Sequence, residues 1–107
     1  MSRLDTARRK LLRRCILELL RAAHSVRYEG WMAERSIFNQ VGPVEDSTFA
    51  EVQAELKYLR DAGLIADEER RETKFDAHNP SYRILPSGID LLDETVPPVP
   101  GVEDNRL

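Results

Sequence analysis

The stretch that decides the fold is residues 63–93, GLIADEERRETKFDAHNPSYRILPSGIDLLD. Two short apolar pieces, at 64–66 and 82–85, lie on either side of a charged segment that is rich in turn-forming residues. Short pieces of this kind, rich in β-forming residues near the second, predict the two strands of a hairpin. Pro86 then falls at or near the first turn of a short predicted helix over 87–93, a position where proline is well tolerated.

Three helices are predicted before the hairpin. Over residues 5–24 apolar side chains recur at helical spacing, which predicts an amphipathic helix. Its apolar stripe comprises Leu4, Leu12, Cys15, Ile16, Leu19, Leu20 and Ala23, and its opposite face carries Arg3, Lys10, Arg14 and Arg21 with Leu17 among them. A short strand is predicted around 31–32 and a second helix over 34–41, ended by Gly42-Pro43.

The third predicted helix begins with a capping signal. The run Thr48-Phe49-Ala50-Glu51 fits the S/T-x-x-E capping box, and Gly63 fits the position that ends a helix. The apolar residues that share the inner face of this helix are Phe49, Val52, Leu56 and Leu59. The predicted fold class is therefore mainly α with a small β-hairpin, an α+β arrangement.

Two groups of residues carry a resemblance to a known family. One is similar to the recognition helix and the start of the wing in bacterial regulators of the MarR and PadR type: Phe49-x-x-Val52-x-x-x-Leu56-x-x-Leu59-x-x-x-Gly63-Leu64-Ile65. The other resembles the end of their wing and the helix after it: Tyr82-Arg83-Ile84-Leu85-Pro86-x-Gly88-x-x-Leu91-Leu92. The resemblance implies a winged helix-turn-helix domain over residues 1–94. Residues 95–107 are rich in proline and have no apolar period, which predicts a flexible tail. In size and style the chain is also similar to small proteins of Mu-like prophages.

The resemblance implies a protein that binds double-stranded DNA, either a small transcriptional regulator or a phage or mobile-element factor. In such a fold the recognition helix enters the major groove, and residues near its N-terminus meet base edges. The residues expected to face DNA are Ser47, Thr48, Glu51, Ala54, Lys57 and Tyr58 on the recognition helix and Arg70, Arg71 and Lys74 on the wing. The first helix is expected to contact DNA or to form a homodimer through Lys10, Arg14 and Arg21.

The charges on these faces leave a second function open. The outward face predicted for the recognition helix carries the acids Glu51 and Asp61 but only one base, Lys57, and Gln53 is placed nearer the buried side. Acids that face a phosphate backbone oppose DNA binding. The alternative is a winged-helix adaptor that binds another protein, without DNA, through the acidic, alanine-bearing face of this helix.

The basic residues of the first helix have several interpretations as well. Residues 1–28 hold eight basic and two acidic side chains, whereas residues 29–107 hold eight basic and seventeen acidic ones. The basic cluster either contacts phosphates, or contacts a second subunit, or pairs with acids elsewhere in the chain.

Composition and motifs argue against other classes of protein. At 107 residues the chain is one small domain, and it has no apolar run long enough for a membrane span and no signal-peptide pattern. Its single cysteine favours a reducing, cytoplasmic setting. Cys15 and His24 fall on opposite sides of one helix, and neither metal-ligand spacing nor a nucleotide-binding glycine pattern occurs. We therefore expect neither an enzyme nor a cofactor or metal.

Overall fold

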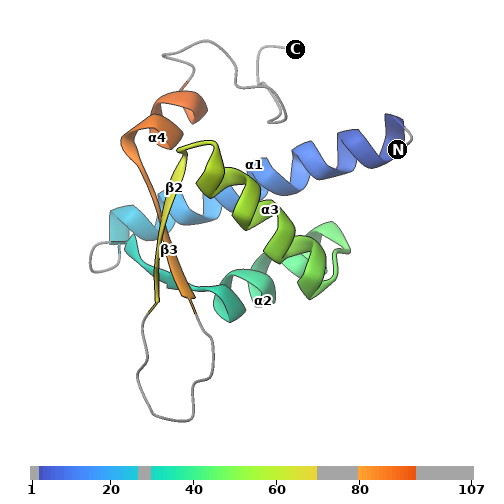
Figure 1. The fold of residues 1–107 in the computed structure, drawn as a ribbon, viewed down its shortest axis with the longest axis horizontal. Helices are drawn as coiled ribbons and strands as arrows, with labels where there is room; N and C mark the ends of the chain where they lie inside the picture. The colour runs from blue at the N-terminus through green and yellow to red at the C-terminus, as the bar shows by residue number, and fades with distance from the viewer. Residues whose placement is uncertain (1–2, 27–29, 70–79, 94–107) are drawn as a thin grey trace.

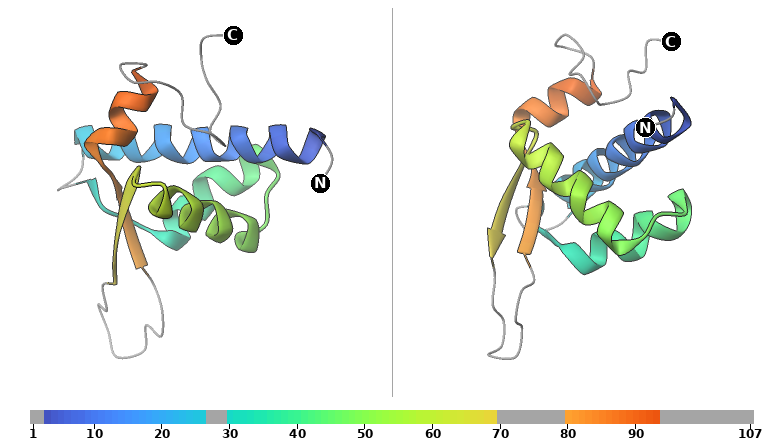
Figure 2. Two further views of the ribbon diagram at one scale, coloured as in Figure 1. Left: turned by 45° about the horizontal axis from the view of Figure 1, so that its top comes forward. Right: turned by 45° about the vertical axis from the view of Figure 1, so that its right-hand side comes forward.

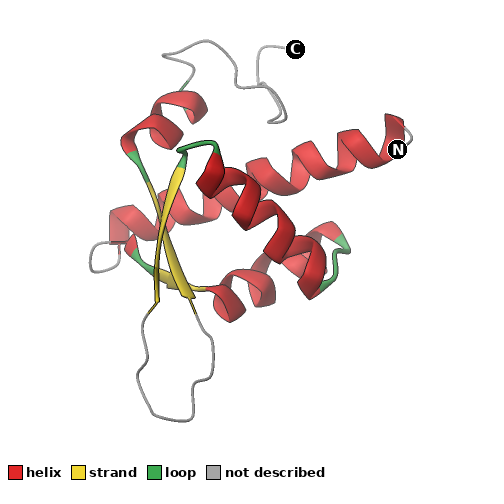
Figure 3. Cartoon of the chain, in the orientation of Figure 1, coloured by secondary structure: helices red, strands yellow, loops and turns green. Residues whose placement is uncertain are grey.

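The computed structural model describes residues 3–26, 30–69 and 80–93 of the chain. The element order is α1 (Arg3–Val26), β1 (Met32–Ala33), α2 (Glu34–Glu45), α3 (Phe49–Asp61), β2 (Ile65–Glu69), β3 (Pro80–Ile84) and α4 (Pro86–Leu92). The described chain is mainly helical with one small antiparallel sheet (Figures 1 and 3). The predicted α+β class is confirmed. No described helix is both long enough and apolar enough to cross a membrane.

The sheet has three strands in the order β1-β3-β2, with β3 in the centre. Met32 is opposite Tyr82 in the β1–β3 pair, and Ile65 is opposite Ile84 in the β2–β3 pair. The predicted hairpin is present, but β2 extends beyond the predicted end at residue 66, and β3 begins before residue 82. The first strand lies one residue later than predicted.

The core lies where α1 meets the other helices and the sheet. Its largest fully buried side chains are Ile16, Leu17, Leu20, Ile37, Val41, Val52, Leu56, Leu59 and Ile65. The prediction that Leu17 lies on the exposed basic face is wrong, because Leu17 is 0% exposed. Since α1 contacts α2, α3, β3 and α4, its buried arc is broader than a single apolar stripe. Leu17 therefore offers no exposed contact to a second subunit, and Leu11 is instead 46% exposed.

The end of α2 also differs from the prediction. The helix continues through Gly42 and Pro43 to Glu45, although Gly42-Pro43 predicts an end at residue 41. A proline removes one backbone N–H donor from the helix, and that loss alone does not end it here. The helix ends instead at Asp46, which adopts the left-handed conformation with φ 51°. The Ser47 N–H then donates to the Gly42 carbonyl oxygen at 2.9 Å.

Both ends of α3 are closed by local hydrogen bonds. The Glu51 N–H donates to the Thr48 hydroxyl oxygen at 3.2 Å, and the Thr48 N–H donates to the Glu51 carboxylate at 2.9 Å. The predicted capping box is therefore present. At the other end Gly63 has φ 77°, which favours glycine, and the Leu64 N–H donates to the Leu59 carbonyl oxygen at 3.1 Å.

The turn between α3 and β2 is covered by α4. The Leu85 N–H donates to the Leu64 carbonyl oxygen at 3.0 Å, and the Ser87 hydroxyl donates to the Gly63 carbonyl oxygen at 2.5 Å. A Cβ atom at Gly88 would lie 2.6 Å from the same Leu64 oxygen, so the backbones approach as closely as glycine allows. As predicted, Pro86 occupies the first turn of α4.

Candidate functional site

One face of α3 lies open on the outside of the molecule. In Figure 1, α3 lies in front of α1, and no other described element lies in front of α3, whereas the left view of Figure 2 shows α3 alongside α1. Its inward face is buried through Val52, Leu56 and Leu59, each 0% exposed. The remaining surface of α3 has two parts, a flank that contacts α1 and a face whose side chains are exposed.

The flank toward α1 contains a buried acid. Glu55 is 3% exposed and accepts hydrogen bonds from the guanidinium groups of both Arg9 and Arg13. The Arg9 Nε–Glu55 Oε1 distance is 2.9 Å. Arg13 is itself 6% exposed, and its guanidinium carbon lies 3.7 Å from the centroid of the Tyr58 ring. We call Arg9, Arg13, Glu55 and Tyr58 the α1–α3 cluster.

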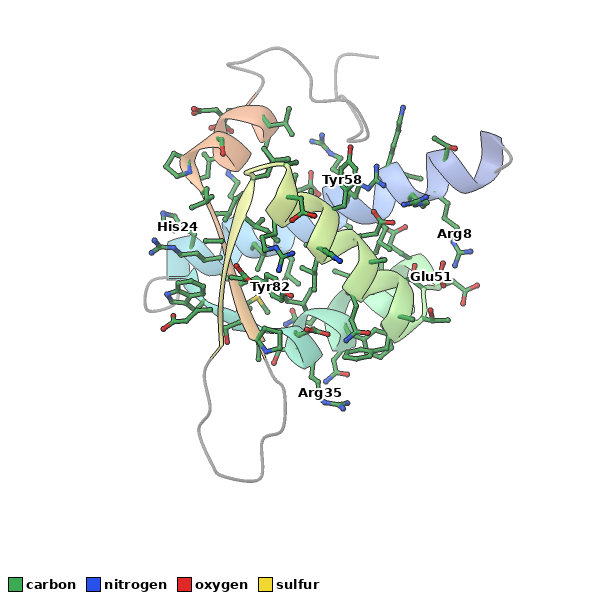
Figure 4. The ribbon with its side chains drawn as sticks, viewed as in Figure 1. Arg8, His24, Arg35, Glu51, Tyr58 and Tyr82 are labelled. Carbon is green, nitrogen blue, oxygen red and sulfur yellow. The ribbon has the colours of Figure 1, made fainter. Side chains whose placement is uncertain are left out.

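Glu51 lies on the same flank, one turn nearer the start of α3. The backbone N–H of Thr48, then its hydroxyl, and finally the Arg8 charge lower the pKa of Glu51 below its ordinary value. Arg8 donates to the Asp46 carbonyl oxygen, and its Nη2 lies 3.9 Å from Glu51 Oε2 (Figure 4). Glu51 is thus held by the cap and by α1.

A hollow of about 210 Å³ lies between α1 and the start of α3. Its lining includes two arginines and two glutamates together with smaller side chains: Arg8, Arg9, Leu12, Ser47, Glu51, Ala54 and Glu55. The formal charges of this lining cancel, so the hollow has no net attraction for an ion of either sign.

The residues predicted to face DNA from the third helix are divided by the structure. Ala54 and Lys57 are exposed on α3. Ser47, by contrast, is buried, and its hydroxyl donates to the Glu45 carbonyl oxygen at 3.2 Å. Three other predicted residues have internal contacts: Thr48 in the cap, Glu51 in the cap and near Arg8, and Tyr58 under Arg13.

The exposed face of α3 is formed by Ala50, Gln53, Ala54, Lys57 and, in the last turn, Asp61, and we call these residues the outward face. The prediction that Gln53 lies nearer the buried side is wrong. The buried arc of α3 includes Glu55, which the apolar pattern does not count, and this turns the opposite face toward Gln53. The basic residues of the first helix were a sequence signal for this difference, because a basic partner for Glu55 would place Glu55 in the buried arc and Gln53 outside it.

Two arginines border the outward face. Arg35, in the first turn of α2, is exposed and lies with its guanidinium carbon 5.3 Å from the centroid of the Phe49 ring (Figure 4). Arg60 forms ion pairs with Asp61 and Asp67, both at 3.2 Å. The Arg60 charge is therefore largely balanced by its two acidic neighbours. The contact of Arg35 with the Phe49 ring was not predicted from the sequence.

The basic residues of α1 mostly form internal ion pairs. Besides the α1–α3 cluster, Arg14 pairs with Glu18 at 3.1 Å and Arg21 pairs with Asp93 of the α4 end at 2.5 Å. Lys10 is half-buried. These arginines therefore pair with acids of the same chain, which is one of the three interpretations given for the basic residues of this helix. The predicted wing contacts Arg70, Arg71 and Lys74 lie outside the described residues.

Two buried polar groups lie on the sheet side of the core. Glu34 is 4% exposed, and its Oε1 has no hydrogen-bond partner within the described part of the chain. Burial, followed by the charges of Glu34 and Asp67, raises the pKa of Tyr82 to about 12. Neither group is open to solvent, so neither forms a binding site.

The described residues contain no group of three or more histidine, cysteine or acidic side chains that could hold a metal ion. Cys15 is half-buried, and burial, followed by the charges of Glu45 and Glu18, raises the pKa of its thiol. A raised pKa reduces the fraction of the nucleophilic thiolate.

No protein-family model, curated protein or solved structure matches this chain.

Proposed function

We propose that this protein is a winged helix-turn-helix protein that binds double-stranded DNA with the outward face of α3 in the major groove. The element order supports the proposal, since α2 and α3 would form the helix pair and β2 and β3 would lead to and from a wing. In this proposal the chain is a small transcriptional regulator or a factor of a mobile element.

The observation that carries the proposal is the composition of the outward face. Two of the three acids of α3, Glu51 and Glu55, lie on the flank that contacts α1. The third, Asp61, lies at the end of the outward face and pairs with Arg60 at 3.2 Å. Acids on a groove-facing surface would repel the phosphates, and the position of Glu51 and Glu55 on the flank reduces this cost. Lys57 and Arg35 are left as exposed cations beside a helix with small side chains.

Few phosphate contacts are available in this arrangement, since the arginines of α1 pair internally. Lys57 and Arg35 provide two, and Arg70, Arg71 and Lys74 would raise the number to five if the wing contacts the backbone. Each neutralised phosphate contributes about −0.9 to the slope of log K against log salt. The slope is therefore expected to lie between about −2 and about −4.5. The binding constant for DNA should then fall by about 10-fold to 500-fold when salt rises from about 50 to 200 mM.

Fluorescence anisotropy with a labelled duplex of mixed sequence tests the proposal. Wild type should bind at about 50 mM salt, and Lys57→Glu should lose most of its affinity because it places an acid in the groove. Lys10→Glu makes the same change of charge on α1, so retained binding would assign the contact to α3, whereas an equal loss would assign part of it to α1. The absence of binding by folded wild type at the lower salt would overturn the proposal.

A protein-interaction adaptor is the second candidate function. It is favoured by the internal pairing of the α1 arginines and by the exposed alanines, which would let another protein approach α3 closely. In that case wild type would not bind duplex DNA, and Ala54→Arg would abolish the capture of a protein partner. Unchanged capture by Ala54→Arg would count against α3 as the contact.

A further inference from the structure

The side-chain amide of Gln53 is free to make new hydrogen bonds. Gln53 is exposed, and within the described residues its amide has no hydrogen-bond partner. It is the only side chain on the outward face that contains both a donor and an acceptor. A group of this kind can recognise a partner that presents a complementary donor and acceptor side by side.

The surroundings of Gln53 are small and apolar. Ala50 lies one turn before it on the same row of the helix, and Ala54 follows it directly. Both side chains are single methyl groups, which allow the helix backbone to come close to a flat surface. The row continues with Lys57, one turn further on, whose ammonium group is a donor only.

On the basis of the proposed function, we infer that this face recognises A·T base pairs in the major groove. Adenine presents its N7 acceptor and N6 donor side by side, and the glutamine amide matches them with two hydrogen bonds. Thymine presents a methyl group, which Ala50 or Ala54 contacts. Recognition of guanine by arginine is disfavoured, because the outward face has no arginine and Arg60 is paired with Asp61 and Asp67.

The position of Gln53 along α3 is consistent with base contact. It lies in the second turn of the helix, whereas Lys57 lies in the third. Residues near the start of a recognition helix meet base edges, and residues further along approach the backbone. Gln53 is therefore the specificity residue, and Lys57 provides a phosphate contact.

The test begins with selection of preferred duplexes from a random-sequence pool by wild type. Anisotropy titrations then compare the selected duplex with variants in which each A·T pair is replaced by G·C. At one position the replacement should weaken wild-type binding by about 10- to 100-fold. Gln53→Met, which keeps the side-chain length without the amide, should bind both duplexes with similar affinity. Replacing the thymine of that pair by deoxyuracil should cost about fourfold, the equivalent of one buried methyl group.

The outcomes separate this inference from the proposed function. Failure of wild type to bind any duplex at about 50 mM salt overturns DNA binding itself, and the inference with it. Binding without a position that prefers A·T, or full discrimination by Gln53→Met, overturns the inference alone. Thermal unfolding of Gln53→Met should match that of wild type, since the side chain is exposed.

Discussion

The two polar surfaces of α3, the flank toward α1 and the outward face, differ in burial. On the flank toward α1, Glu55 is 3% exposed between two arginines, while two residues earlier in the chain Gln53 is open to solvent. Of the three acids of the helix, only Asp61 lies on the outward face, and it pairs with Arg60. The comparison teaches that the charge of a segment is a poor measure of the charge of its surface, because acidic residues can themselves be the contacts between helices.

The α1–α3 cluster contributes more to orientation than to net stability. Burying a carboxylate and a guanidinium costs several kcal/mol of desolvation, which their attraction offsets only when the geometry is good. Arg13 meets this condition by contacting both Glu55 and the Tyr58 ring. The cluster joins α3 to α1 through one buried acid, on the flank beside the outward face.

The largest effect should come from breaking this cluster. Glu55→Ala leaves Arg13 buried without its acid, and we expect it to lower the free energy of unfolding by about 3 to 5 kcal/mol. Urea unfolding followed by circular dichroism measures the loss, and Gln53→Ala on the outward face is the matched control. A loss below about 1 kcal/mol would show that solvent screens the pair as it does at a surface.

The double variant Glu55→Leu/Arg13→Met gives a further check of the same prediction. With both charges replaced by apolar side chains of similar size, stability should return to within about 1 kcal/mol of wild type. A double variant as unstable as Glu55→Ala would mean that packing, rather than charge, determines the cost.

A smaller effect is expected at the cap of α3. Thr48→Ala removes the hydroxyl that accepts the Glu51 N–H, and it should cost about 1 kcal/mol in the same unfolding measurement. Thr48→Asp, which can also accept this bond, should cost less. Equal costs for the two variants would argue against the hydroxyl as the relevant group.

The cap should also depend on pH. Since Thr48 lowers the pKa of Glu51 in the folded chain, the carboxylate stabilises the fold above its ordinary pKa of 4.5. This contribution is lost as the pH falls through the lower value of the folded state. The stabilities of wild type and Glu51→Gln should therefore differ at neutral pH and converge in acid. A constant difference would contradict the assigned cause.

The smallest effect on stability is expected for exposed charges. Arg8 and Glu51 are 3.9 Å apart with side chains 46% and 44% exposed, so Arg8→Ala should change stability by at most about 1 kcal/mol. Lys57→Ala on the outward face should change it by less than about 0.5 kcal/mol. A larger loss for Lys57→Ala would remove the distinction between the two surfaces.

Much of the fold could be predicted from local patterns. The capping box at Thr48, the hairpin strands and the proline at the start of α4 follow from residues that are adjacent in sequence. The extension of α2 past Pro43 could not be predicted, because helix termination depended on the left-handed conformation of Asp46 rather than on the proline.

The candidate site was less predictable than the fold. The apolar pattern of the third helix does not count Glu55 as a core residue, and it places Gln53 toward the inside. The burial of Glu55 depends on Arg9 and Arg13, which are more than forty residues away in sequence. The burial of Leu17 likewise results from contacts of α1 on several sides. Long-range pairing of this kind leaves no signal in the spacing of one helix.

The close contact at Gly88 has a consequence for the evolution of this fold. Any side chain at this position would push α4 away from the Leu64 carbonyl oxygen and withdraw Leu91 and Leu92 from the core. Gly63, where a Cβ would meet nothing within 4 Å, is constrained only by its backbone conformation. Remote relatives that retain this packing should therefore keep glycine at position 88, whereas position 63 should also accept asparagine, which tolerates the left-handed conformation.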